Sequence, residues 1–509
     1  SNPETDTIMK KIFLLLSTIF ALGLYSCSDN FLVVESKGSI LESNYYNSAD
    51  RLYSGLVAAY DPLQWFDYFY QYNSLNMVSD IMADDIYTGG SNEGDQPILV
   101  KAHFYTATST DVPNMIWTTA YSGVNRSNIV IAKAPEIEME EALKAKYVAE
   151  AKILKAYYYN ILWKFWGNIP YYDENLSFPY ITDQVPADQV YQNIITTIED
   201  ALAMNSLPMK APVGEEGRIT KAMAYMLYTE VVLYQNDESR FNTAFQYMKE
   251  IIDSGQYSLV NDFQGIWKEE GEWGPESIWE INYISEGGVR DWSAPIATGG
   301  SVYPVLIGIP GYVGNDFCDG WGFSPVAESA YNMYEEGDIR RDGGILNFAK
   351  HADETGASYT ARWQDTGYFL LKYIGRKNGN HGYTADPNLN YGNNQRVYRY
   401  AETLLNAAEL IARGAGSGDA SSYLNAIRTR AQVPPVSATL DNIIEERHLE
   451  FVGEGKRYWD LIRTGKAASV LTADNHLYRT VNWTSQKKYW PIPQSEIDKS
   501  AGTLTQNPY

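Results

Sequence analysis

Basic residues and histidine are scarce in this chain of 509 residues. Lys and Arg total 40 against 63 Asp and Glu, which gives a formal net charge of −23. A chain this acidic repels phosphate backbones at long range, so we expect no nucleic-acid partner. The five histidines are scattered, with no H-E-x-x-H pair and no cluster with cysteine. We therefore predict no metal site and no cofactor.

Enzyme signatures are also missing. Gly455-Lys456 and Gly465-Lys466 lack the upstream glycine of a nucleotide-binding P-loop, and no G-x-S-x-G elbow offers a serine nucleophile. These absences predict that the chain is not an enzyme. A glycoside hydrolase stays open as an alternative, because it needs only two suitably separated carboxylates and acidic residues are abundant.

Apolar side chains and tyrosine are plentiful. Hydrophobic residues make up 45% of the chain and charged residues 20%, an ordinary globular balance with enough apolar mass for a large core. Tyrosine occurs 41 times, against 16 phenylalanines and 13 tryptophans. Aromatic rings with a polar tip suit surfaces that are half wet and half packed, so this excess favours a binding protein.

The N-terminus predicts export and a lipid anchor. Lys10 and Lys11 precede an uncharged run over residues 12–24, which resembles the core of a signal peptide and is too short to span a bilayer. The sequence L-Y-S-C that ends at Cys27 resembles a lipobox, although its tyrosine is bulkier than usual. We predict that residues 1–26 are an N-terminal extension and lipoprotein signal peptide and that Cys27 is acylated. A plain secretory peptide is the alternative.

Lipidation of Cys27 would have two consequences for the exported chain. Cys318 would have no partner for a disulfide, so stability must come from core burial. No later segment approaches the roughly 18 apolar residues of a transmembrane helix, so we expect the lipid to be the only anchor.

Apolar residues recur with a helical period through much of residues 27–509, which we predict to be a single domain. The expected helices span residues 48–61, 115–134, 139–165, 187–205, 219–236, 240–255, 395–413, 418–431 and 440–463. Stacked helix pairs of roughly 34 residues are the tetratricopeptide pattern, and alanines at facing positions let such helices approach closely. The predicted fold class is mainly α, with a scaffold over about 40–61, 113–255 and 395–470.

Two long segments between these helices have a different composition. Residues 62–112 and 256–394 are predicted to be loop-rich, and the second is rich in Gly, Asp, Asn, Trp and Tyr. Short strands are expected at residues 277–283 and 368–374, where aromatic and β-branched residues recur. Loops of this length are uncommon in compact domains unless they are functional, so we expect them to carry the ligand site.

Several blocks carry a family resemblance. Residues 445–463, EERHLEFVGEGKRYWDLIR, form the most specific block. The other blocks are EAKILKAYYY at 150–159, FWGNIP at 165–170, GDIR at 337–340, RYAETLLNAAE at 399–409, LNAIRTRA at 424–431, PIPQSEI at 491–497 and QNPY at 506–509. Together they resemble the SusD-like (SusD/RagB) family of outer-membrane nutrient-binding lipoproteins.

This resemblance implies a fold, a location and partners. The implied fold is a scaffold of about four tetratricopeptide-like helix pairs with a variable, loop-rich binding region. The implied place is the cell-surface side of the outer membrane, as a lid over a SusC-like TonB-dependent transporter. We expect the chain to capture an oligosaccharide or polysaccharide and deliver it to that transporter. A peptide-binding member of the family is one alternative, and a pure protein adaptor is another.

The charged residues of the most specific block are predicted to be structural. On one continuous helix, Glu446, Glu450 and Glu454 would lie four residues apart, with Arg447 and Arg457 three residues from a glutamate. The prediction is a ladder of ion pairs along that helix, because carboxylates interleaved with arginine are held ionised and are poor proton donors.

Sugar recognition needs flat apolar rings and polar side chains that hydrogen-bond hydroxyl groups, and the loops offer both. The candidate glycan-binding residues are Trp65, Asp84, Asp85, Trp292, Tyr303, Tyr312 and Trp321. The alternative for each ring is that it packs its loop onto the scaffold. Trp163, Trp166 and Trp459 lie on apolar helix faces and are assigned to the core.

Overall fold

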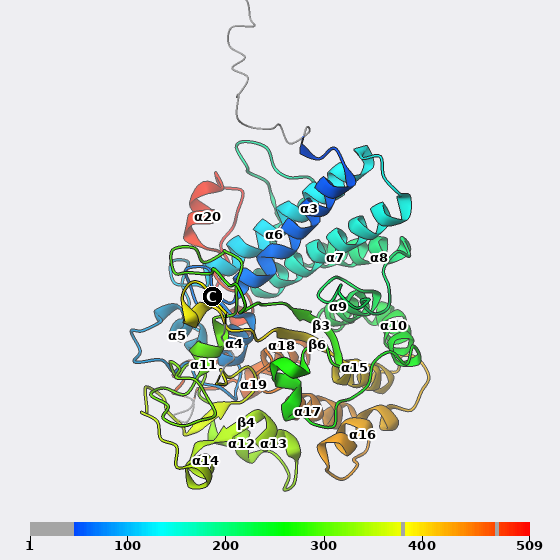
Figure 1. The fold of residues 1–509 in the computed structure, drawn as a ribbon. Coiled ribbons are helices and arrows are strands. Elements are labelled where there is room, and N and C mark those ends of the chain that lie inside the picture. The colour runs from blue at the N-terminus through cyan, green and yellow to red at the C-terminus, as the bar shows by residue number, and fades with distance from the viewer. Residues whose placement is uncertain (1–44, 378–381, 474–477) are drawn as a thin grey trace, which may run out of the picture. The chain divides into compact units, whose positions relative to one another are not determined.

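Long helices with buried apolar faces form the scaffold, as the sequence predicts (Figure 1). The computed structural model describes residues 45–377, 382–473 and 478–509, so Cys27 lies outside the described residues. The scaffold helices are α3 (Ala49–Tyr60), α6 (Asn114–Lys133), α7 (Glu141–Trp166), α8 (Ala187–Ala203), α9 (Lys221–Gln235), α10 (Phe241–Asp253), α15 (Tyr400–Ala412), α16 (Ala420–Ala431) and α17 (Leu440–Glu450). Among the described residues, no helix has both the length and the apolar character needed to cross a bilayer.

Neighbouring helices pack in chain order through most of the scaffold. α6 packs on α7, α7 on α8, α8 on α9 and α9 on α10. α10 then packs on α15, so the scaffold continues across the long segment that separates these two helices in sequence. Small residues permit close approach: a Cβ added at Gly123 of α6 would lie 2.3 Å from the Tyr158 ring of α7. The predicted helical scaffold with loop-rich insertions is confirmed.

Two predicted helices need correction. Residues 440–463 do not form one helix, because α17 ends at Glu450 and α18 spans Arg457–Arg463. Between them, Gly453 and Gly455 have φ values of 80° and 70°, the left-handed region that glycine adopts without strain. Residues 395–399 are also not helical, because β6 (Gln395–Arg399) precedes α15.

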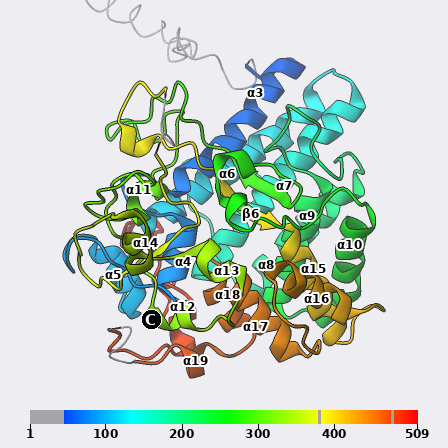
Figure 2. The same cartoon turned by 60° about the horizontal axis from the view of Figure 1, so that its bottom comes forward.

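Short helices and strands lie within the insertions and also outside them. The short helices are α4 (Leu75–Ile81), α5 (Pro97–Phe104), α11 (Tyr303–Ile307), α12 (Glu328–Asn332), α13 (Ile339–Gly344), α14 (Phe348–Thr355), α19 (Ala467–Val470) and α20 (Gln494–Lys499). The strands form three antiparallel pairs: β1 (Ile169–Pro170) with β2 (Gln184–Val185), β3 (Ser277–Ile281) with β6, and β4 (Ile345–Asn347) with β5 (Tyr368–Leu370). Both predicted strands are therefore confirmed. Figures 1 and 2 place α4, α5 and α11 together at one side and α10, α15 and α16 at the other.

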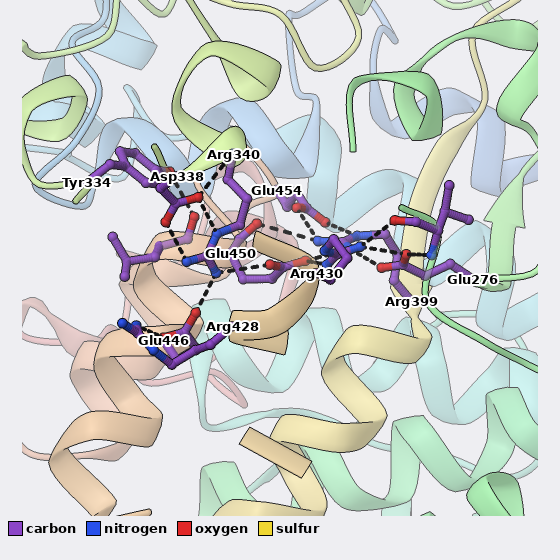
Figure 3. A network of polar contacts seen from close by, with 12 residues as sticks. Glu276, Tyr334, Asp338, Arg340, Arg399, Arg428, Arg430, Glu446, Glu450 and Glu454 are labelled. Atoms are coloured by element: carbon purple, nitrogen blue, oxygen red, sulfur yellow. Dashed lines mark hydrogen bonds and ion pairs between the residues drawn. The ribbon is translucent and has the colours of Figure 1, made fainter. Parts of the chain in front are cut away.

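The predicted ladder of ion pairs along one helix is wrong, and the charges instead join distant elements. Figure 3 shows Glu450 of α17 between Arg340 of α13 on one side and Arg399 and Arg430 on the other. Glu454 pairs with Arg399 at 2.7 Å. Glu450 ends α17 and Glu454 lies between α17 and α18, so the network ties residues 338–340 and the β3–β6 pair to the scaffold.

The network is buried, and its central carboxylate, Glu450, remains ionised. Burial opposes the charged form of Glu450, but the guanidinium groups of Arg430, Arg399 and Arg340 together lower the pKa of Glu450 to about 2. The structural interpretation of this block is thus supported, although its geometry differs from the prediction. Trp163, Trp166 and Trp459 are buried, as predicted.

Candidate functional site

A tight aromatic turn follows the end of α3. A short 3-10 helix spans Asp61–Phe66 with Pro62 in its first turn, and Tyr68 and Tyr72 then form an antiparallel bridge around the turn. Tyr70 lies at the tip with a φ of 59°, and 61% of the residue is exposed. The turn therefore holds Tyr68 and Tyr72 side by side, with their ring centroids 5.9 Å apart.

A buried arginine ties this turn to the loop that follows β3. Arg290 forms an ion pair with Asp67 at 2.7 Å, and its Nη2 donates to the Tyr68 carbonyl at 2.6 Å. Its other donors bond the carbonyls of Pro295 and Gly300. Since the guanidinium is fully buried and its donors have partners, Arg290 fixes the position of both loops.

Four rings from three loops lie next to one another at this point. The ring centroids of Trp292 and Trp321 are 5.9 Å apart with an interplanar angle of 21°. Tyr68 meets Trp292 edge-on at 5.3 Å, and Tyr72 lies 6.0 Å from Trp321. Trp292, Trp321 and Tyr72 are partly exposed, whereas Tyr68 is buried behind Trp292. We call Tyr68, Tyr72, Trp292 and Trp321 the aromatic arc.

The segment that carries Trp321 is held by the loop that follows α4. Gly89 pairs with Phe323, and Ile86 pairs with Val326, in isolated antiparallel bridges. A Cβ at Gly89 would lie 2.3 Å from the Gly322 carbonyl oxygen, so glycine is needed for this approach. Arg362 donates to the Trp321 carbonyl at 3.0 Å and fixes the same segment from the solvent side.

Polar groups border the arc. Burial raises the pKa of Tyr72 to about 12, with smaller contributions from Tyr68 and Asp95, so the Tyr72 hydroxyl is neutral at physiological pH. Asp95 is held by Ser91, whose backbone N–H and hydroxyl both donate to its Oδ2 at 2.9 Å. Rings flanked by a hydroxyl and a carboxylate offer both surfaces that a sugar needs: an apolar face and partners for hydroxyl groups.

The structure brings together two of the predicted ring residues and separates the others. Trp292 and Trp321 meet in the arc. Trp65 is only 3% exposed, and the Arg126 guanidinium lies 4.8 Å from its ring centroid. Tyr303 and Tyr312 are also buried, and the Tyr312 hydroxyl lies 3.1 Å from Nε2 of His351. These three rings pack their loops, which was the alternative that the sequence left open.

Asp84 and Asp85 contact the C-terminal block. Arg457 binds both oxygens of Asp84, at 2.9 and 3.1 Å, and Nε2 of His448 lies 2.9 Å from both oxygens of Asp85. Burial opposes both charged forms, but Arg457 lowers the pKa of Asp84 and Asp85 raises the pKa of His448. The two carboxylates thus hold their segment against α17 and α18.

These residues have the composition of a metal site but are already neutralised. The ligand atoms of Asp84, Asp85 and His448 lie within 4.8 Å of one another. A divalent cation would have to compete with the Arg457 guanidinium for Asp84 and with His448 for Asp85. The donor set therefore fits two ion pairs better than a metal.

Sequence reasoning did not single out Tyr72 and Asp95. A signal for Tyr72 exists in the alternation Tyr68-Phe69-Tyr70-Gln71-Tyr72 after the helix stop, which is typical of a hairpin with every second side chain on one face. Asp95 has no such signal, because its place beside Tyr72 depends on how the glycine-rich loop folds back.

Comparisons with known proteins were made for the sequence and the structure. A model described as SusD family matches residues 275–509, and one described as "Starch-binding associating with outer membrane" matches residues 72–252. SusD-like protein P38 of Formosa agariphila is 26% identical, over 95% of this chain and 96% of its own length.

Two solved structures are more similar in sequence. Surface glycan-binding protein A from Bacteroides thetaiotaomicron, in complex with laminarihexaose, is 48% identical with a TM-score of 0.88, and the match covers 91% of this chain and 100% of that chain. A laminarin-binding SusD-like protein is 30% identical with a TM-score of 0.81, over 91% of this chain and 100% of that chain.

Proposed function

Because the chain belongs to the SusD-like family, we propose that it is a cell-surface glycan-binding protein that captures an oligosaccharide or polysaccharide for import. The observation that carries this proposal is the aromatic arc. Partly exposed rings cover the apolar C–H face of a sugar, and the nearby hydroxyl and carboxylate groups accept or donate hydrogen bonds. Binding a glycan through these contacts requires no catalytic step.

We propose a laminarin-type β-1,3-glucan as the ligand. Two relatives support this class, one solved with laminarihexaose and one named for binding laminarin. Such a chain is neutral, which suits an arc bordered by the carboxylates of Asp95 and Asp386 on a strongly acidic protein. These relatives favour a glycan over the peptide that other family members could take.

The proposal extends to the lipid anchor at Cys27 and to a transporter as the protein's partner. Acylation at Cys27 would hold the protein on the outer membrane, which agrees with the description of the family model that matches residues 72–252. From there it would deliver its ligand to a SusC-like TonB-dependent transporter. We also propose that the protein releases its ligand unchanged, because Glu450 and Glu454 of its most specific sequence block are paired with arginine and lysine.

The test is isothermal titration calorimetry of the purified protein against laminarin, other neutral glucans, an acidic polysaccharide and a peptide mixture. Binding of laminarin without turnover supports the proposal. Binding of peptide alone would place the chain with peptide importers, and release of shorter sugars would make it a hydrolase. A protein that binds the transporter but none of these ligands would be an adaptor.

A further inference from the structure

The indole of Trp292 has a fixed hydrogen-bond partner. Its Nε1 donates to Oδ2 of Asp386 at 2.7 Å, and the two residues come from different loops. The N–H is the only polar group of a tryptophan side chain. Because Asp386 accepts it, the ring is left with apolar faces for a ligand, and its rotation about the side-chain bonds is restricted.

Asp386 is itself held in place. It caps the short 3-10 helix Pro387–Leu389, and its Oδ1 accepts from the Asn388 backbone N–H at 2.8 Å. Fully buried Asn390 donates to the Asp386 carbonyl at 2.7 Å and to the Arg290 carbonyl at 2.9 Å. The carboxylate is therefore part of a rigid support.

Glycines make room for this support. A Cβ at Gly299 would lie 2.3 Å from Oδ1 of Asn390, and a Cβ at Gly300 would lie 2.2 Å from the Asn390 backbone carbon. The Gly300 N–H donates to Oδ1 of the same asparagine at 3.2 Å. Residues 386–390 can thus pack directly against the loop that carries Trp292.

We propose that Asp386 is a positioning residue of the glycan site, which acts on the ligand through Trp292 and not by direct contact. The inference rests on the proposed function and adds a fourth loop, residues 386–390, to the site. Its physical basis is preorganisation: a ring that is already fixed in its binding orientation loses less conformational freedom when the ligand arrives.

The test variant is Asp386→Ser. A serine hydroxyl is a good cap and still reaches the Asn388 N–H, but it is too short to reach the indole. We expect the affinity for laminarihexaose to fall about fivefold, the value of one side chain that must be immobilised on binding. Asp291→Ala is the matched control, because among the described residues that carboxylate accepts only from the neighbouring Ser293. The affinity of this variant should equal that of wild type.

A double-mutant cycle with Trp292→Phe separates positioning from loop folding. Phenylalanine keeps an apolar ring and has no N–H, so adding Asp386→Ser to Trp292→Phe should cause no further loss. An equal loss in both backgrounds, or no loss in either, would overturn the inference. If wild-type protein fails to bind laminarihexaose, it is the proposed function that fails.

A measurement without ligand tests the inference even if the wild-type protein does not bind laminarihexaose. The ¹⁹F resonance of Trp292 in protein labelled with 5-fluorotryptophan is identified by its disappearance in Trp292→Phe. Asp386→Ser should shift and broaden this resonance, while Asp291→Ala leaves it unchanged. An unchanged resonance in Asp386→Ser would show that the carboxylate does not fix the ring.

Discussion

Arg290 and Asp67 form an ion pair of 2.7 Å in which both side chains are at most 4% exposed. The pair joins the turn after α3 to the loop after β3, and these loops contribute three of the four rings of the aromatic arc. Asp67 also accepts from the Val302 backbone N–H at 2.7 Å. The position of the aromatic arc therefore depends on a buried contact that lies outside the arc.

Removing one partner of this pair should disrupt both stability and binding. Arg290→Ala leaves the Asp67 carboxylate buried without its cation, and a broken buried ion pair costs about 3–5 kcal/mol. We expect a loss of this size in the free energy of unfolding measured in urea, together with loss of glycan binding. Lys499→Ala is the control, because Lys499 is exposed and its pair with partly exposed Glu496 is worth at most about 1 kcal/mol. Equal effects of the two substitutions would contradict this account.

Two tryptophans should respond in opposite ways to truncation. Trp321→Ala removes a partly exposed ring of the arc, and loss of a recognition hot spot costs on the order of 2 kcal/mol, or about thirtyfold in affinity. Trp65→Ala removes a buried ring, which costs about 3–5 kcal/mol of folding stability. Calorimetric titration and urea denaturation of both variants check this contrast. Wild-type glycan affinity in Trp321→Ala would remove that ring from the site.

The pair of His448 and Asp85 predicts a pH dependence of stability. Burial alone would lower the pKa of His448, but the Asp85 carboxylate raises it by a larger amount. The pKa of His448 in the folded state therefore lies above the usual 6.5. The ion pair therefore contributes fully below pH 6.5, and the contribution is lost as the pH rises through the folded-state pKa.

The measurement is the free energy of unfolding of wild type and His448→Gln at pH about 5.5 and about 9. The difference between the two proteins should be larger at the lower pH. A difference that is the same at both values would show that the charge of His448 does not contribute.

Cys27→Ala should release the protein from the membrane without changing its fold, because the lipid is the only anchor that the sequence predicts. One acyl chain binds a membrane reversibly, whereas several hold it firmly. Cell fractionation and circular dichroism test the two halves of this prediction. A variant that stays tightly bound to the membrane would exclude lipidation as the anchor.

Local patterns predicted the scaffold well, because the helical period of apolar residues is a property of neighbouring residues. α6 and α7 begin and end close to the expected positions. The break at Gly453 and Gly455 was missed, because the charge spacing on either side fits a continuous helix and the partners that replace it are remote. Arg340 and Arg399 reach Glu450 only in the folded chain.

The candidate site was predicted in part for a similar reason. Trp292 and Trp321 were identified from composition, since rings among hydrogen-bonding residues are typical of sugar sites. Burial could not be predicted for Trp65, because the loop that carries it continues α3 as a 3-10 helix and packs that ring inside. The contact of Asp386 with Trp292 joins two loops whose approach depends on Gly299 and Gly300, and no local pattern marks such a contact.

The most direct test of glycan capture is a calorimetric titration of the wild-type protein with glucose, laminari-oligosaccharides of increasing length and laminarin, each with and without a chelator. An arc of partly exposed rings gains little from a single sugar, because a small contact must offset the lost freedom of the ligand. Longer chains add contacts and chances to rebind. The account predicts weak binding that begins at several sugar units, is unchanged by the chelator and leaves the ligand intact. Tight binding of glucose, loss of binding with the chelator, or turnover of the ligand would contradict it.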